Sequence, residues 1–316
     1  MKYSRQILLI LTGGLGNQLF QVAAGLALSN GTEFLVDKSV GKPRTNSKDE
    51  PELVSFVLPK QIRFLPTRKG SWLVSKSSGY VLRMGIAKRK YENIFIIREF
   101  IIFSASLISS LYFRSIRQNI SAVGIGFSKI TIPKRKIVLS GYFQSYRWAS
   151  NLEVKNQLMA LRIRNEGNEL KFYKSLSLIE KPLVIHIRLG DYKIEPDFGV
   201  LSNDYYIQAI SNIPSESYNK IWLFSDEPEL AQNYFDDILR EKIRVIPEID
   251  NSAASTLELM RYGHCYIIGN STFSWWGAFL RYRGNAKIVA PKPWFKDMPE
   301  PRDLIPLDWI RILAWK

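Results

Sequence analysis

The chain has 316 residues, of which 46% are hydrophobic, and its 44 Lys and Arg outnumber its 29 Asp and Glu to give a net charge of +15. At roughly 150 residues per domain, this length predicts two domains with large buried cores. The single Cys265 excludes an intrachain disulfide framework and a cysteine metal cluster, which suits a reducing compartment. The apolar run near the N-terminus is shorter than a signal peptide's, and the longest later run is too short for a membrane span. We therefore expect a cytoplasmic protein.

A β-α-β pattern opens the chain within residues 7–37. A short apolar strand (ILLIL) precedes a glycine loop (GGLGNQLFQ), which begins an amphipathic helix, and a second strand (TEFLVD) follows. Gly14 and Gly16 fit the first two positions of a G-x-G-x-x-G dinucleotide loop, but Leu19 occupies the third. Asp37 lies where a ribose-binding acid would be expected, so a nicotinamide enzyme is an alternative on these residues.

The positive charge is concentrated in residues 58–136, which hold 16 Lys and Arg and two acids, Glu92 and Glu99. Nucleic acid, an anionic membrane surface and a phosphorylated substrate would each suit such an excess, and a basic solvated face is the plain alternative. Neither a zinc-finger spacing nor an RNP-like aromatic motif favours nucleic acid. The pattern of residues 61–136 assigns neither helices nor strands.

A second α/β region begins at a boundary that we place at residue 150, which gives domains 1–149 and 150–316. A helix pattern covers roughly 150–180, and beyond it strands alternate with loops and helical stretches. This alternation predicts a parallel sheet with helices on both faces. The strands are expected within KPLVIHIRLGDY (181–192), KIWLFSDEPEL (220–230), HCYIIGNSTFSWWGAFL (264–280) and AKIVAPKPWF (286–295).

The first of these strands carries two basic side chains. Because side chains alternate along a strand, His186 and Arg188 share one face and Ile187 and Leu189 share the other. Both basic residues lie at the carboxyl end of the strand, where open α/β sheets bind ligands. A phosphate would suit the guanidinium of Arg188, and the alternative is an internal ion pair with a carboxylate such as Asp191.

Two later strand ends carry further polar residues. Ser271, Thr272 and Ser274 open an apolar helix, where backbone N–H groups and the helix dipole favour an anion, although serine and threonine are also ordinary helix caps. Asp226 is either the cap of the next helix or a contact to a ribose or base. The sequence contains no D-x-D, and its two histidines are far apart, so we expect no metal site.

Four stretches together carry a resemblance to a known family. GGLGNQLFQ, HIRLGDY, FSDEPE and NSTFSWWGA occur in the order and spacing of the inverting α-1,2-fucosyltransferases of bacterial type, glycosyltransferase family 11. The resemblance extends from Gly13 to about Trp294. It implies a GT-B fold, in which an acceptor-side Rossmann-like domain (1–149) and a GDP-fucose-binding one (150–316) face each other across a cleft. It also implies that no metal or other cofactor is needed.

The resemblance further implies roles for individual residues. Arg188 would contact the diphosphate, His186 would lie near the nucleoside, and Asn17 would reach the donor from the N-terminal domain. The glycine loop would then allow close approach to the diphosphate and would not bind a dinucleotide. Asp191, or next Asp226, is the candidate base. We assign catalysis to Arg188, Asp191 and Asn17, and donor binding to Gly14, Gly16, Asn17, His186, Arg188, Asp226, Glu258, Ser271, Thr272, Phe273 and Ser274.

The sequence departs from the family pattern at two positions. Leu189 replaces a second arginine, and alternation puts its side chain on the opposite face of the strand from Arg188, so this replacement does not imply a loss of donor binding. Thr256 stands where the family tends to carry an acid, and Glu258 is the nearest acid after it. Which residue recognises the guanine is therefore open.

We expect metal-independent transfer of L-fucose from GDP-fucose to O2 of a terminal β-galactoside, with inversion. The acceptor would be a surface glycan or oligosaccharide, including one still linked to a lipid diphosphate, and nucleic acid is not an expected partner. The basic region would then dock on the anionic inner face of the cytoplasmic membrane. The alternatives are a nicotinamide-dependent oxidoreductase and a non-enzymatic module that binds membrane or nucleic acid. The expected membrane contacts are Lys88, Arg89, Lys90, Lys134, Arg135 and Lys136.

Overall fold

A computed structural model describes residues 7–38, 50–65, 100, 104, 117–121, 126–130, 137–195 and 197–315. Contacts divide the chain into two compact units: unit 1 comprises Met1–Arg162 and Pro299–Ile305, and unit 2 comprises Ile163–Met298 and Pro306–Lys316. Each unit contains a parallel sheet, which confirms the expected α/β class. The helices α4 (Tyr146–Ala149) and α5 (Leu152–Met159) belong to unit 1 because they pack on α1, so the contacts divide the units after Arg162, beyond the boundary placed at residue 150.

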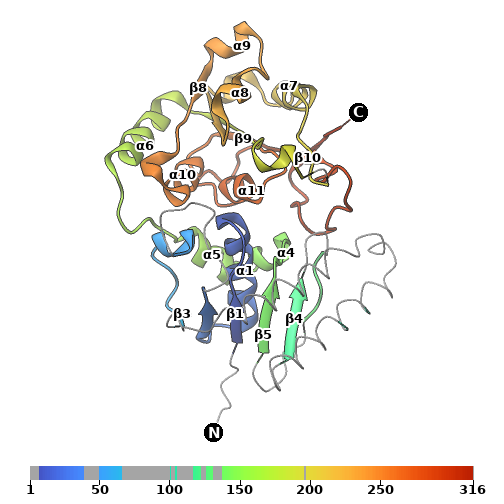
Figure 1. Ribbon diagram of the computed structural model, residues 1–316. Coiled ribbons are helices and arrows are strands. Elements are labelled where there is room, and N and C mark those ends of the chain that lie inside the picture. Colours follow the sequence, from blue (N-terminus) through green and yellow to red (C-terminus); the bar gives the residue numbers. More distant parts are fainter. Residues whose placement is uncertain are drawn as a thin grey trace. The chain divides into compact units, whose positions relative to one another are not determined.

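The described residues of unit 1 form five parallel strands in the order β3-β2-β1-β5-β4 (Figure 1). The predicted β-α-β opening is confirmed, because β1 and β2 flank α1. That helix ends where Asn30 and Gly31 take left-handed backbone conformations. The strands are β1 (Ile7–Ile10), β2 (Phe34–Asp37), β3 (Ile62–Phe64), β4 (Arg117–Ser121) and β5 (Ile137–Gly141), and the helices are α1 (Leu15–Ser29), η1 (Glu52–Ser55), α4 and α5.

Unit 2 contains six parallel strands in the order β11-β10-β9-β6-β7-β8. The four strands expected from the sequence are β6, β7, β9 and β10, whereas β8 and β11 were not anticipated. The strands are β6 (Leu183–Ile187), β7 (Ile221–Ser225), β8 (Ile243–Val245), β9 (Cys265–Ile267), β10 (Ile288–Lys292) and β11 (Ile310–Leu313).

The helix predicted over 150–180 is interrupted. Ala160 ends α5, and Gly167 precedes α6 as its N-cap, so eight intervening positions leave the helical conformation. The helices of unit 2 are α6 (Asn168–Glu180), η3 (Asp191–Lys193), α7 (Asn203–Ser211), η4 (Ser215–Ser217), α8 (Pro228–Gln232), α9 (Asp237–Glu241), η5 (Ile249–Asn251), α10 (Ala253–Met260) and α11 (Thr272–Phe279).

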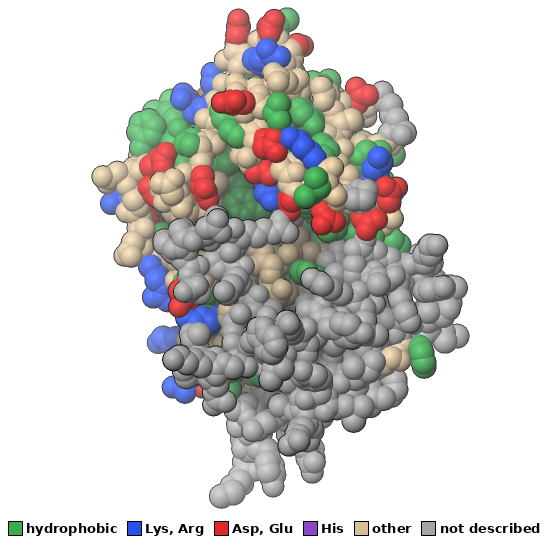
Figure 2. Space-filling view, viewed as in Figure 1, with side chains coloured by type: hydrophobic (Ala, Val, Ile, Leu, Met, Phe, Trp, Pro, Cys, Tyr) green, Lys and Arg blue, Asp and Glu red, His purple; other side chains and the backbone are tan. Residues whose placement is uncertain are grey.

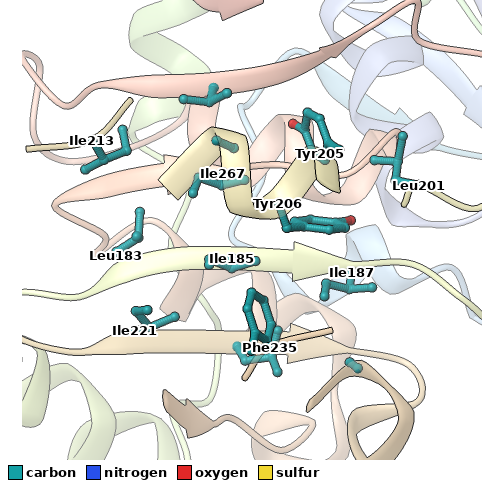
Figure 3. Packing of buried hydrophobic residues seen from close by; sticks show 14 of the residues in the cluster. Leu183, Ile185, Ile187, Leu201, Tyr205, Tyr206, Ile213, Ile221, Phe235 and Ile267 are labelled. Carbon is teal, nitrogen blue, oxygen red and sulfur yellow. The ribbon is translucent and has the colours of Figure 1, made fainter. Parts of the chain in front are cut away.

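One face of the unit 2 sheet is buried under α7 and α8. Figure 3 shows Tyr205 and Tyr206 of α7 lying over Ile185 and Ile187 of β6. Leu189 continues the same buried face and is 2% exposed. The alternation predicted for this strand is thus confirmed, because the aliphatic residues pack into the core and leave the opposite face to His186.

Apolar side chains also gather on the surface of unit 2. Phe172, Leu178 and Ile179 of α6 are exposed, and Figure 2 shows hydrophobic side chains over this helix. None of the helices in the described ranges has the length and apolar character needed to cross a membrane.

Candidate functional site

The strand order of unit 2 reverses between β6 and β9. From β6 the chain proceeds outward through β7 to β8, then crosses to β9 and proceeds in the other direction through β10 to β11. Right-handed crossovers therefore place the helices that follow β6 and β9 on opposite faces of the sheet. The loops after β6 and β9 diverge, and such a switch point is where open parallel sheets bind ligands.

Arg188 follows β6 at this switch point and pairs with two carboxylates. Its Nε and Nη2 lie 2.9 and 2.8 Å from Oδ1 of Asp191, and its Nη1 lies 3.2 Å from Oδ2 of Asp226. The side chain is 29% exposed. The internal ion pair weighed from the sequence is thus present, and a second acid joins it. Since each Nη carries two hydrogens, one N–H on each remains for a ligand.

Asp226 also holds the loop that follows Arg188. Its Oδ1 accepts the backbone N–H of Leu189 at 3.0 Å. A Cβ at Gly190 would lie 2.4 Å from Oδ2 of Asp226, so glycine is needed there for the close approach of loop and carboxylate. One of the two alternatives from the sequence, that Asp226 caps α8, is wrong. Glu227 occupies the cap position, and Pro228 follows at the first helical position, where proline is favoured.

His186 lies beneath this loop and is 5% exposed. Its Nδ1 is buried and has no hydrogen-bond partner within the described part of the chain, and its ring centroid lies 5.9 Å from that of Phe273 on α11. Burial, reinforced by the charge of Arg188 and opposed by Asp226, lowers the pKa of His186 from 6.5 to about 4. The imidazole is therefore neutral near pH 7, and it offers a hydrogen bond there but no positive charge.

Three tyrosine hydroxyls hold the diverging strand ends. Pairing between β6 and β9 ends at Ile185 and Ile267, so the carbonyls beyond lose their ladder partners. Tyr206 Oη donates to the carbonyl of His186 at 3.3 Å, and Tyr205 Oη donates to that of Ile268 at 2.7 Å. In the next loop, Tyr192 Oη donates to the carbonyl of Asn270 at 3.0 Å. Sequence reasoning missed these residues, although Tyr192 directly follows HIRLGD.

The start of α11 uses two of its hydroxyls internally. Ser271 is the N-cap, and its Oγ accepts the N–H of Phe273 at 3.3 Å. Ser274 is fully buried and donates to the carbonyls of Gly269 and Ser271. Thr272 and Phe273 are half-buried, so they are the two of the four predicted residues that keep exposed surface at this helix start.

In unit 1, the glycine loop follows β1 and is fixed by two buried glutamines. Gln21 exchanges two hydrogen bonds with the backbone of Thr12 and donates to the carbonyl of Gly141 at the end of β5. Gln18 donates to the carbonyl of Gly13. Gly13 itself has φ +75°, a left-handed value that favours glycine. The two glutamines of GGLGNQLFQ thus hold the loop, and the side chain of Asn17 accepts a hydrogen bond from Gln144 at 3.0 Å.

Comparison with known proteins gives the family. The sequence profile of glycosyl transferase family 11 matches residues 6–312. The chain belongs to glycosyl transferase family 11. An Escherichia coli α-1,2-colitosyltransferase is 28% identical over 186 residues, which are 57% of this chain and 63% of that protein. The Escherichia coli O-antigen biosynthesis glycosyltransferase WbnK is 35% identical over 137 residues, 42% of this chain and 45% of that protein.

This family 11 chain therefore matches less than two thirds of the length of those two relatives. Among solved structures, the α-1,6-fucosyltransferase NodZ soaked with GDP-fucose is a distant likeness. It is 13% identical, with a TM-score of 0.48, over 92% of this chain and 96% of that one.

The residues predicted for the family 11 site are divided between the two units. His186, Arg188, Asp191 and Asp226 meet at the end of β6, and the residues 271–274 follow the neighbouring β9. Gly14, Gly16 and Asn17 lie in unit 1 at the start of α1. The basic residues 88–90 and 134–136 lie outside the described residues.

Glu258 of the family 11 chain lies in a different cluster, near the end of α10. It is fully buried, and its carboxylate binds Arg261 Nη1 at 2.7 Å, Tyr282 Oη at 2.8 Å and Lys174 Nζ at 3.5 Å. Since α10 leads into β9, its last turn approaches the amino edge of the sheet, opposite the edge that carries Arg188. The structure does not bring Glu258 to the other predicted donor-binding residues.

Proposed function

We propose that the protein transfers L-fucose from GDP-fucose to O2 of a terminal β-galactoside, with inversion and without a metal. The observation that carries the proposal is the position of Arg188 at the switch point of unit 2, directly after β6, which pairs with the strand β9 that leads to α11. A guanidinium and a helix N-terminus are both suited to a diphosphate. Membership of family 11 supports glycosyl transfer as the reaction class.

In the proposed reaction, the acceptor O2 forms a bond to C1 of fucose on the face opposite GDP, while the bond from C1 to the diphosphate oxygen breaks. Negative charge then grows on the diphosphate. The free N–H groups of Arg188 and the positive end of α11 stabilise this charge where it develops. Asp191 and Asp226 hold the guanidinium in one orientation before the substrate arrives, so less reorganisation is needed during the reaction.

The proton released by the acceptor needs a recipient, and Asp191 is the better of the two candidate bases. Asp226 uses one oxygen for Arg188 and the other for the N–H of Leu189, so both of its oxygens already have partners. A carboxylate bound to a guanidinium is a weak proton acceptor. The oxocarbenium character of the fucosyl group reduces the need for a strong base. His186 serves as a neutral hydrogen-bonding partner of the nucleoside.

Two relatives bear on the identity of the donor and of the acceptor. One relative is an α-1,2-colitosyltransferase, and colitose is fucose without O3, so GDP-colitose is the competing donor. The other belongs to O-antigen biosynthesis, which favours a glycan acceptor, including one linked to a lipid diphosphate. The proposal includes a GT-B arrangement, with the acceptor on unit 1 and the donor on unit 2.

A screen of donors against acceptors tests the proposal. GDP-fucose and GDP-colitose are each offered with lactose and other β-galactosides, and the product linkage is determined by NMR. We expect GDP release and a new α-1,2 linkage with GDP-fucose as the preferred donor. Transfer from GDP-colitose alone would correct the donor, and no transfer from either, together with a thermal shift by NAD and none by GDP, would favour the oxidoreductase alternative.

Peripheral membrane contact is a separate part of the proposal. The excess of Lys and Arg in residues 58–136 supports it, because each basic residue near an anionic leaflet gains about 1 kcal/mol. Co-sedimentation should require anionic vesicles and should weaken with salt and with charge reversal at residues 88–90 and 134–136. Equal binding to neutral vesicles, or none to either, would remove the membrane as a partner.

A further inference from the structure

The loops that follow β1 and β5 in unit 1 lie next to each other, because these two strands pair. The chain leaves β1 toward β2 and β3, while β5 pairs with the opposite edge of β1. The loop after β1 contains Gly13 and Gly14, and the loop after β5 contains Gln144, so both loops leave the carboxyl edge of the sheet side by side. This edge is where an open parallel sheet accommodates a ligand.

Gln144 is the unusual residue at this edge. Its side chain is 4% exposed, and its Nε2 donates to Oδ1 of Asn17 at 3.0 Å. Its Oε1 is buried and has no hydrogen-bond partner among the residues that the structure describes. A buried acceptor without a donor destabilises the folded chain, and few such groups occur in a native protein. The chain thus keeps a polar atom here that its own described residues do not use.

The pair formed by Asn17 and Gln144 presents one donor and one acceptor. Gln144 offers its carbonyl oxygen, while Asn17 offers its Nδ2 hydrogens. If both amides were rotated by 180°, Asn17 would donate to Gln144, and the pair would still offer one carbonyl oxygen and one NH2 group. The pair thus offers one donor and one acceptor in either orientation of the two amides. A hydroxyl group is both donor and acceptor, so it matches such a pair.

The neighbouring Gly14 leaves room for this ligand. It is exposed, it takes an extended backbone with φ −76°, and a Cβ added there would meet nothing within 4 Å. Neither backbone nor packing thus requires glycine at this position. Among the described residues, the first turn of α1 contains no acid and Gly14 at its N-cap makes no side-chain cap, so the positive end of the helix dipole is not neutralised there.

We propose that Asn17 and Gln144 together bind one hydroxyl group of a pyranose substrate at the carboxyl edge of unit 1. This makes Gln144 a binding residue that the sequence motifs did not indicate, although it lies in the stretch GYFQS after β5. The nature of the pyranose rests on the proposed function. Its two possible sources are the sugar of the nucleotide donor and the galactoside acceptor.

The variant Gln144→Leu tests the pair, because leucine approximates the volume of glutamine without its amide. We expect about a 10-fold or greater loss of kcat/KM, mainly as a rise in KM for one substrate. The melting temperature should stay close to that of the wild type, because removal of the unpartnered acceptor offsets the loss of the hydrogen bond to Asn17. Gln157→Leu is the matched control, since Gln157 lies on α5 of the same unit, and its Oε1 is also buried without a partner. It should leave KM unchanged.

Deoxy substrates identify the source of the hydroxyl. Wild type and Gln144→Leu are each assayed with GDP-fucose against GDP-colitose, and with lactose against its 3-, 4- and 6-deoxygalactose analogues. For the hydroxyl bound by the pair, removal should slow the wild type and should have little further effect on the variant. If this difference between wild type and variant appears with the donor pair, the pair of amides binds the donor sugar. If it appears with the lactose analogues, the pair binds the acceptor.

Two outcomes would overturn the assignment. One is an unchanged KM for both substrates in Gln144→Leu, and the other is a lower melting temperature with an equal loss toward both substrates, which would mean a purely structural role.

If the wild type transfers neither sugar, the proposed function fails, and binding is measured instead by saturation-transfer NMR with lactose and L-fucose. Contact signals that are lost in Gln144→Leu would support the hydroxyl site, and signals equal in both proteins, or absent from both, would overturn it.

Discussion

Asp226 binds Arg188 and the residue that follows it. Oδ2 of Asp226 lies 3.2 Å from Nη1 of Arg188, while Oδ1 accepts the N–H of Leu189. The direction of the guanidinium and the course of the loop are thus set by the same carboxylate. Because Leu189 is anchored in the core, Arg188 cannot turn away without disturbing the end of β6.

Replacement of Arg188 by alanine should lower kcat by about 100-fold or more, because the diphosphate loses its main cation. Arg188→Lys should restore only part of the rate, since a point charge replaces a planar fork. Steady-state kinetics with GDP-fucose and lactose measure both. Arg244→Ala is the matched control: Arg244 pairs with Glu180 away from the switch point, so its loss should leave kcat intact. Near-wild-type rates in Arg188→Ala would remove this residue from the mechanism.

The variant Asp226→Asn separates orientation from folding. Asparagine can still accept the N–H of Leu189, but it no longer pairs as an anion with Arg188. We expect roughly a 10-fold fall in kcat from the less constrained guanidinium, with a melting temperature close to that of the wild type. Kinetics and thermal unfolding of the same preparation provide the two readings. A large loss of stability with unchanged kcat in the surviving enzyme would contradict the orienting role.

The depressed pKa of His186 gives stability a defined pH dependence. Between its folded value of about 4 and its ordinary value of 6.5, the unfolded chain binds a proton that the folded chain does not. The contribution of His186 to the free energy of unfolding therefore has its full value above pH 6.5. It decreases as the pH falls toward 4, by roughly 3 kcal/mol in total. Denaturant unfolding at several pH values should show a smaller acid dependence in His186→Asn than in the wild type.

The comparison with His186→Asn is needed because burial and nearby Arg283 and Lys181 also lower the pKa of His264 to about 4. That group is present in both proteins, so the difference between them isolates His186. The rate profile carries a second expectation: kcat/KM should contain no step from His186 between pH 5.5 and 8. Identical acid dependence in the two proteins would mean that His186 titrates normally.

Removal of the Tyr206 hydroxyl should loosen the end of β6. Tyr206→Phe leaves the carbonyl of His186 without its donor, which should cost about 1 kcal/mol of unfolding free energy and raise the KM for the donor. Tyr234→Phe is the control, because Tyr234 packs against Tyr206 and its hydroxyl bonds to no carbonyl of the described residues. If both variants behave alike, ring packing and not the hydroxyl is what matters.

Chelation should not affect the rate. In the proposed reaction, Arg188 and the start of α11 neutralise the diphosphate, so the charge balance needs no divalent ion. Turnover with and without EDTA, followed by addition of Mg²⁺ or Mn²⁺, measures this directly. A large loss with EDTA that either ion restores would show that the neutralisation assigned to Arg188 is incomplete.

Much of the fold follows from local pattern. The alternation of β6 was predictable because its Ile185, Ile187 and Leu189 form a clear apolar face, and the motif glycines marked the start of α1. The presence of β9 was predictable in the same way, but its end was not: the apolar run suggested a strand as far as Asn270, whereas β9 ends at Ile267. The short strands β8 and β11 were not, because three or four residues give too little periodicity to distinguish a strand from a loop.

Residues whose roles depend on distant partners escaped the sequence. Asp226 was given the choice of helix cap or ligand contact, whereas its partners Arg188 and Leu189 lie 38 and 37 positions earlier. Gln144 acquires its role from Asn17, 127 positions away. Glu258 was placed with the donor because of its proximity to a motif position, but a buried arginine on its own helix takes its carboxylate. Spacing along the chain contains no signal for such tertiary partners.

The pairing of β1 with β5 has a consequence for how the nascent chain folds. β5 inserts beside β1 only after residue 137 has been synthesised, and Gln21 then reaches the carbonyl of Gly141 across 120 positions. Until then, one edge of an apolar strand has no partner, which invites association with other chains. Pairings of such long sequence separation form slowly. Expression at lower temperature or with chaperones should therefore improve the yield of folded protein, and fragments that end before β5 should aggregate.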